Sequence, residues 1–166
     1  MRAIQDHEQA VEVARALLET TGFSSFRLST QFTLRFCRNR PMSLHMRPLP
    51  MEVELDLLGD WWLDDADEWA KKVAELAPPG AVEPEEPVQA YELAALRWTE
   101  GTAIESIKLD DHGLSICFQN GRVLTASAAL KAEGPAWALY ASTEWSVVSD
   151  RGALFVRAPF LEGDHR

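Results

Sequence analysis

Residues 107–126 read IKLDDHGLSICFQNGRVLTA, and this stretch decides the fold. Apolar residues alternate with polar ones before and after residues 110–113, and alternation of period two indicates β-strands with one face toward a core. Asn120-Gly121 is the strongest short-range hairpin signal in the chain, because a two-residue hairpin turn favours residues that accept a positive φ. The stretch therefore predicts three antiparallel strands joined by two tight turns.

The same period continues on both sides of this stretch. Toward the C-terminus, alternating apolar residues predict three more strands, up to about residue 157. Toward the N-terminus, residues 23–57 contain four short alternating runs, separated by the turn residues of Asn39-Arg40-Pro41 and Pro48-Leu49-Pro50. These runs predict a second group of antiparallel strands with one solvent-facing side.

Helical periodicity appears in three places. Residues 6–20 have one apolar face, with Asp6 and Gln9 as a variant of the capping box. Residues 65–77 have a second apolar face that includes Trp69, with Asp64 or Asp65 as its N-cap. Residues 89–98 could form a short third helix. The fold class expected is therefore α+β, with two groups of short antiparallel strands and a few flanking helices.

The best linker candidate is residues 78–88, PPGAVEPEEPV. It divides the chain into 1–77 and 89–166, which we expect to pack as one compact domain. The two parts have a similar order of elements, and TLRFCRNR (33–40) resembles SICFQNGR (115–122). Duplication of an ancestral unit is one explanation of this likeness.

Charge excludes several classes of partner. The chain has 166 residues and a net charge of −10, which argues against binding nucleic acid or anionic membranes and favours a basic partner or simple solubility. Neither a signal peptide nor a stretch of transmembrane length is apparent. We expect a cytoplasmic protein.

The sequence contains no motif that predicts catalysis. Neither a phosphate-binding glycine loop nor a G-x-S-x-G elbow occurs, and the four histidines have no partner at metal-ligand spacing. Asp110-Asp111-His112 could be a catalytic cluster, but polar residues before a glycine are typical of a turn. We therefore predict no catalytic, cofactor-binding or metal-binding residue, and no enzyme.

Opposite charges occupy neighbouring parts of the sequence. Residues 22–50 hold five arginines and no acid, whereas residues 51–69 hold eight acids and no base. One interpretation is internal: if strands 42–47 and 51–57 pair, the outward arginines can form cross-strand ion pairs with the outward acids. The residues in question are Arg35, Arg47, Glu52, Glu54 and Asp56.

The acids after residue 59 need another explanation. Trp61 and Trp62 are adjacent, so they cannot both point inward if the chain is extended there. An exposed tryptophan among carboxylates has the composition of a binding hot spot for a basic partner. The predicted partner-binding residues are Asp60, Trp61, Trp62, Asp64, Asp65, Asp67 and Glu68.

The stretches LSICFQNGRVLTASA and PAWALYASTEWSVV resemble the strand cores of small bacterial immunity-type proteins of polymorphic toxin systems. The resemblance covers roughly residues 103–157 and carries over no binding residue. It implies an acidic protein that neutralises a basic, nuclease-type toxin. Two alternatives stay open: a non-catalytic adaptor or self-associating protein, and an enzyme or small-ligand binder with a pocket near Trp137, Tyr140 and Trp145.

Overall fold

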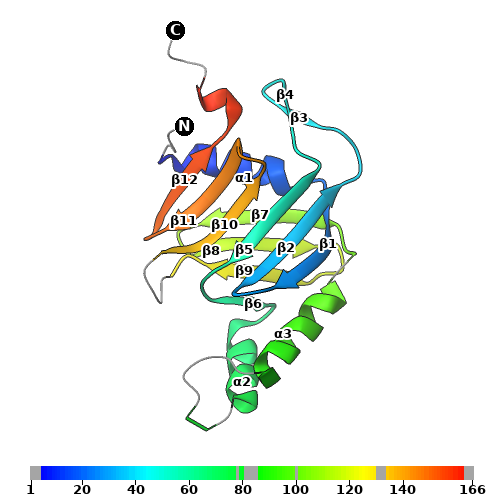
Figure 1. Cartoon of the computed structure of the whole chain (residues 1–166), viewed down its shortest axis with the longest axis vertical. Coiled ribbons are helices and arrows are strands. Elements are labelled where there is room, and N and C mark those ends of the chain that lie inside the picture. The colour runs from blue at the N-terminus through cyan, green and yellow to red at the C-terminus, as the bar shows by residue number, and fades with distance from the viewer. Residues whose placement is uncertain (1–4, 78, 81–85, 100, 130–133, 163–166) are drawn as a thin grey trace.

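Two antiparallel sheets pack face to face in the computed structural model, which describes residues 5–77, 79–80, 86–99, 101–129 and 134–162 (Figure 1). The larger sheet has the strand order β1-β2-β5-β10-β11-β12. Its strands are β1 (Thr21–Leu28), β2 (Phe32–Arg38), β5 (Glu52–Leu57), β10 (Pro135–Ala141), β11 (Trp145–Asp150) and β12 (Ala153–Arg157). The second sheet has the order β6-β9-β8-β7. Its strands are β6 (Trp61–Leu63), β7 (Ile104–Asp110), β8 (Gly113–Phe118) and β9 (Val123–Ser127).

The α+β class expected from the sequence is confirmed. Alternation works as expected in the strands, because one side chain in two points into the space between the sheets and is buried. The rings of Phe23, Phe36 and Phe118 meet there, with the centroid of Phe23 5.6 Å from that of Phe36 and 6.1 Å from that of Phe118. The strands of the two sheets cross steeply in Figure 1, as in orthogonally packed sandwiches.

The helices occupy the two ends of the sandwich (Figure 1). α1 (His7–Leu18) contacts β7, β11 and β12, so it fills one end between the sheets. Its N-cap is confirmed, since the Asp6 carboxylate accepts a hydrogen bond of 3.0 Å from the backbone N–H of Gln9. α2 (Ala66–Leu76) and α3 (Glu86–Thr99) lie together at the other end, where the rings of Trp69 and Tyr91 are 5.0 Å apart.

Two sequence-based boundaries need correction. α3 begins at Glu86, inside the segment expected to be a linker, while residues 78 and 81–85 lie outside the described part of the chain. Residues 42–47 do not form a strand beside β5. They belong to a small hairpin of β3 (Ser43–Leu44) and β4 (Arg47–Pro48), in which both turn residues, His45 and Met46, have positive φ. This turn reverses the chain, so alternation there does not extend a sheet.

Each sheet takes strands from both halves of the sequence. The order helix, strand, strand, strand occurs as α1-β1-β2-β5 and again as α3-β7-β8-β9. The strand after each unit then crosses to the other sheet, because β6 pairs with β9 and β10 pairs with β5. The similar stretches 33–40 and 115–122 contain most of β2 and β8, the middle strands of the two units. This is the topology that a duplicated unit with exchanged strands would give.

Arg38, one of the five arginines of the basic stretch, is a buried structural residue with 4% of its surface exposed. Its guanidinium donates to the carbonyl oxygens of Ala16 and Leu17 at 3.0 Å and to that of Glu19 at 3.3 Å. These carbonyls lie at the C-terminal end of α1, where no further helical N–H reaches them. Burial lowers the pKa of Arg38. The residue therefore fastens α1 to the end of β2.

Candidate functional site

The two adjacent tryptophans point to opposite sides of β6, as the extended chain requires. Trp61 is 9% exposed, and its ring centroid lies 5.2 Å from those of Phe32 and Trp69. Trp62 is half-buried on the outer face of the four-stranded sheet, where it pairs in register with Thr125. Of the two, Trp62 is therefore the residue that a partner can reach.

Two of the predicted acids hold the local structure together. The Asp64 carboxylate accepts a 3.0 Å hydrogen bond from the backbone N–H of Val123 and lies 2.6 Å from Nε of Arg122. Asp65 is the N-cap of α2, and its carboxylate accepts from the backbone N–H groups of Asp67 at 3.0 Å and Glu68 at 2.8 Å. These contacts fix the direction in which α2 leaves β6.

The remaining acids flank Trp62 in the sequence. Asp67 and Glu68 are exposed in the first turn of α2, where the helix dipole favours negative charge. Asp60 precedes β6 and is half-buried, and its carbonyl oxygen accepts a 2.9 Å hydrogen bond from the N–H of Ser127. We call Trp62 together with Asp60, Asp64, Asp65, Asp67 and Glu68 the Trp62 face. It contains every predicted partner-binding residue except Trp61.

The outer face of the six-stranded sheet carries a different arrangement of charge, centred on Glu54. The Glu54 carboxylate lies 3.2 Å from Arg27 and 3.2 Å from Arg35, and it accepts a 3.0 Å hydrogen bond from the hydroxyl of Tyr140. Beside it, the hydroxyl of Thr33 donates to Asp56 at 2.6 Å. We call Arg27, Arg35, Glu54 and Tyr140 the Glu54 network.

The internal interpretation of the charges is therefore right for Arg35 and wrong for Arg47. β5 pairs with β2, which brings Arg35 opposite Glu54, whereas Arg47 lies in the separate β3–β4 hairpin. Alternation in β1 could have identified Arg27 as a third member. Tyr140 could not have been found, because no sequence signal shows that β10 pairs with β5.

Contacts within the Glu54 network shift the pKa values of Glu54 and Tyr140 away from neutral pH. Partial burial opposes the charge of Glu54, but hydrogen bonds from Tyr140 and Arg35 and the nearby arginines outweigh it and lower its pKa. Burial and the hydrogen bond to Glu54 raise the pKa of Tyr140 to about 12. Efficient general acid–base catalysis uses groups with a pKa near the working pH. The shifts of Glu54 and Tyr140 move both groups away from that range.

Glu92, which sequence reasoning missed, is the one described carboxyl group whose pKa is raised to about 7. It is 9% exposed and shares the buried face of α3 with Val88, Ala95 and Leu96. Burial is the cause of the shift. The sequence could have identified Glu92 as buried, because its helical spacing places it on the same face as these apolar residues.

The Asp110-Asp111-His112 cluster is a turn, as predicted. Asp110 pairs with Gly113 across the β7–β8 hairpin, and its carboxylate accepts a 2.9 Å hydrogen bond from the N–H of His112. Gly113 has φ +142°, and a Cβ there would lie 2.1 Å from the carbonyl oxygen of Ala126. Within the described ranges, no group of three or more His, Cys, Asp or Glu side chains could hold a metal ion.

Both cysteines are free and half-buried rather than deeply buried. Phe36 and Phe118 take the inward positions next to them, so the alternation of the strands turns Cys37 and Cys117 outward. The thiol of Cys117 lies 3.8 Å from a carboxylate oxygen of Glu105.

No family model matches this chain, and neither a curated protein nor a solved structure is significantly similar to it. In the part of the chain that the structure describes, no helix is both long enough and apolar enough to cross a lipid bilayer.

Proposed function

We propose that this protein is a non-catalytic binding protein that holds a basic protein partner against the Trp62 face. The observation that carries the proposal is the outward, half-buried position of Trp62 on β6, the strand that leads through a short turn into the exposed acids at the start of α2. A tryptophan anchor supplies apolar contact area at low entropic cost, and surrounding carboxylates select a basic surface.

The distribution of charge supports this choice of face. The net charge of −10 attracts a basic partner over a distance, and residues 51–69 contain acids but no base. Arg122 is paired with Asp64 at 2.6 Å, which leaves the exposed first turn of α2 strongly acidic. The Glu54 network offers no negative field, because its two arginines outnumber its one carboxylate.

The resemblance to immunity-type proteins gives this proposal its most specific form. An immunity protein of this kind would block a basic, nuclease-type toxin by covering its positive substrate-binding surface. Such inhibition requires a rigid complementary face and no cofactor. The proposed site of action is the cytoplasm, where the protein would meet such a toxin.

Capture from extracts of the native host, with this chain as bait, tests the proposal. We expect wild-type protein to retain a basic protein at low salt and to lose it at high salt, because exposed charges are screened over about 8 Å at physiological ionic strength. Trp62→Ala should weaken binding by more than about 1 kcal/mol, as expected for an anchor. Asp67→Asn combined with Glu68→Gln should mainly slow association.

Phe155→Ala is the matched control, because Phe155 is a half-buried aromatic residue on the outer face of the other sheet. It should leave capture unchanged. Equal capture by all variants, or capture of an acidic protein, would contradict the proposal. Unfolding transitions of each variant must be measured alongside, since Asp67 and Glu68 also favour the start of α2.

Self-association is a second candidate function, favoured by one observation. Ala138, Val148 and Phe155 are half-buried and lie in register across β10, β11 and β12, which makes a short apolar row beside the Glu54 network. A second copy could cover this row. Sedimentation at increasing concentration would show a dimer that Phe155→Ala dissociates, and a monomer at all concentrations would exclude this candidate.

A further inference from the structure

One edge of the larger sheet lacks the features that protect the other edges. β12 forms this edge (Figure 1), and no backbone in the described part of the chain hydrogen-bonds to its far side. The other edge strands of the two packed sheets are protected, since β1 and β7 each carry a β-bulge and a charged residue, and β6 has only three residues. Such features prevent pairing with another chain. β12 pairs with β11 in unbroken register, and its only charge is at its last residue, Arg157.

The turn before β12 shows which backbone groups of this strand are free. The two residues of the β11–β12 turn have φ values of +52° and +74°, and Asp150 lies opposite Ala153, so the strands are joined by a two-residue hairpin turn. The residues that flank such a turn exchange backbone hydrogen bonds, and hydrogen-bonded pairs then alternate with non-hydrogen-bonded ones. The N–H and C=O groups of Leu154 and Val156 therefore point away from β11.

This free edge is complementary to itself. When two copies of β12 run antiparallel with Phe155 at the two-fold axis, Leu154 of each copy lies opposite Val156 of the other, and these pairs can exchange backbone hydrogen bonds. Phe155 then faces its counterpart in a non-hydrogen-bonded pair, in which side chains lie closest. Because Phe155 lies in register with Val148 and Ala138, the apolar row on the outer face becomes continuous through both copies.

Charges are complementary in the same register. Arg157 of one copy lies opposite Ala153 of the other, and Ala153 in turn lies opposite Asp150. Asp150 and Arg157 are half-buried on the outer face, and neither forms an ion pair within the described ranges. Adjacent strands lie about 4.8 Å apart, so an arginine side chain can extend over the small alanine to the Asp150 carboxylate. The two-fold axis repeats this contact.

We propose that this protein forms a two-fold dimer by edge-to-edge pairing of β12, which joins the larger sheets of two copies into one. This dimer goes beyond the binding function of the Trp62 face, which belongs to the other sheet. It rests on the second candidate function, self-association, and gives that function a contact and a register. Because one short strand of each copy makes the contact, the dimer is expected to be weak and concentration-dependent.

Amide hydrogen exchange of the full chain, with sedimentation as the measure of dimerisation, tests the proposal. At a concentration about ten times the dissociation constant, the amides of Leu154 and Val156 should exchange about fivefold more slowly than in the monomer. The amide of Phe155 points toward β11, so its exchange should be the same at both concentrations.

The possible results separate this dimer from the other proposals. A dimer in which the Leu154 and Val156 amides gain no protection would overturn the edge pairing but keep self-association through the apolar row. A monomer at all concentrations would overturn both. Neither result affects the Trp62 face, which is tested separately by capture of a basic partner.

Reversed charges test the register. Arg157→Asp and Asp150→Arg each bring like charges together across the axis, so each variant alone should dimerise about tenfold more weakly than wild type. An equimolar mixture of the two variants should form heterodimers with nearly wild-type affinity, which would also show that both variants fold. Arg40→Asp, at an exposed arginine outside β12, is the matched control and should dimerise like wild type. A mixture that associates no better than either variant alone would overturn the proposed register.

Discussion

The Glu54 network and the Trp62 face use charges from the same part of the sequence in opposite ways. In the Glu54 network, the outward residues of β1, β2, β5 and β10 meet in register, and one carboxylate is held by Arg27, Arg35 and Tyr140. On the Trp62 face, Asp60 precedes β6, and the other four acids follow the end of this strand at Leu63 and occupy a loop and a helix start.

The difference shows where a run of like charges forms ion pairs within the protein. Two runs of opposite sign that both lie in strands can pair across the sheet, each pair contributing up to about 1 kcal/mol. Beyond the end of β6, Asp64 still pairs with Arg122. The acids that follow it serve the start of α2 or remain available to a partner.

The largest loss of stability is expected on substitution of Arg38, the one arginine of the basic stretch that is buried. Arg38→Met should lower the free energy of unfolding by about 3 kcal/mol, because the last carbonyls of α1 lose a buried charged donor. Chemical denaturation measures the loss. Arg40→Met, at an exposed position two residues on, is the control and should change stability by less than about 0.5 kcal/mol. Similar losses in both variants would contradict the structural role of Arg38.

Glu92 belongs neither to the Glu54 network nor to the Trp62 face, and it shows what happens to an acid that is buried among apolar residues. The ordinary pKa of a glutamate carboxyl group is 4.5, whereas that of Glu92 in the folded protein is about 7. Between these pH values the folded state therefore binds more protons than the unfolded state. Stability should therefore fall as pH rises through this window. Glu92→Gln should raise the free energy of unfolding by about 2 kcal/mol at pH 8 and change it little at pH 4.

Denaturation curves of wild type and Glu92→Gln across this pH range provide the measurement. Glu75→Gln, an exposed acid on the neighbouring helix α2, is the matched control. Parallel pH profiles for wild type and Glu92→Gln would show that the carboxyl group is not buried in solution.

Removing the acceptor of the Glu54 network should have a smaller effect. Glu54→Gln should cost about 1 kcal/mol at neutral pH, since two arginines and a tyrosine lose a charged acceptor on a partly exposed face. Because the folded-state pKa of Glu54 is lowered, its contribution is present above the ordinary pKa of 4.5 and is lost as pH falls through the folded-state value.

Unfolding measured at pH 7 and pH 3 tests both statements about Glu54. The difference between wild type and Glu54→Gln should be smaller at pH 3 than at pH 7, because the carboxylate takes up a proton as pH falls through its lowered pKa. Binding of the proposed basic partner should not change, because the Glu54 network and the Trp62 face lie on different sheets. Loss of partner binding in Glu54→Gln would break the comparison between the two faces.

The smallest expected effect is that of Tyr140→Phe. Loss of one hydrogen bond to Glu54 should cost about 0.5 kcal/mol. The raised pKa, about 12, also predicts that one of the two tyrosines ionises late in an alkaline titration followed by absorbance. Tyr140→Phe should remove that late step, and its persistence would assign it to Tyr91 instead.

The sequence predicted the elements better than their partners. Alternation located the strands because burial of one face imposes period two, and it separated Trp61 from Trp62 for the same reason. It could not reveal that β5 lies between β2 and β10, since pairing over long sequence distances leaves no local pattern. It also counted Arg38 with the surface charges, because its burial depends on where α1 ends.

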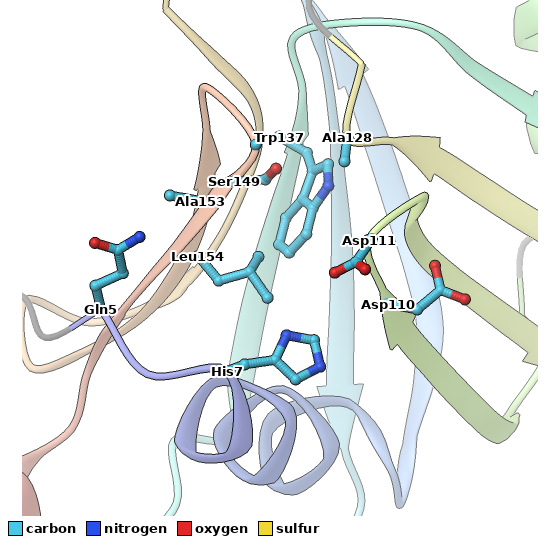
Figure 2. A pocket seen from close by; sticks show the side chains of 10 residues that line it. Gln5, His7, Asp110, Asp111, Ala128, Trp137, Ser149, Ala153 and Leu154 are labelled. Carbon is cyan, nitrogen blue, oxygen red and sulfur yellow. The ribbon is translucent and has the colours of Figure 1, made fainter.

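The candidate sites, like the elements of the fold, were predictable only where their residues are close together in the sequence. The Trp62 face was predictable because its residues are neighbours in sequence. The small cavity lined by His7, Asp111 and Trp137 was not, because the start of α1, the β7–β8 turn and strands β10 to β12 build it. The turn at Asp110–Gly113 was correctly predicted, yet only the fold brings Asp111 to the edge of this cavity, as Figure 2 shows.

The exchange of β6 and β10 between the sheets has a consequence for how the chain reaches its folded state. Glu54 and Tyr140 lie 86 positions apart in sequence, and neither sheet is complete until such distant strands meet. Folding rates fall as contacts become less local, so we expect a slow folder, in the range of milliseconds to seconds. Until β10 arrives, the backbone of β5 is an open edge and its inward side, Val53, Leu55 and Leu57, is not yet fully covered, so the nascent protein can pair with another chain and aggregate.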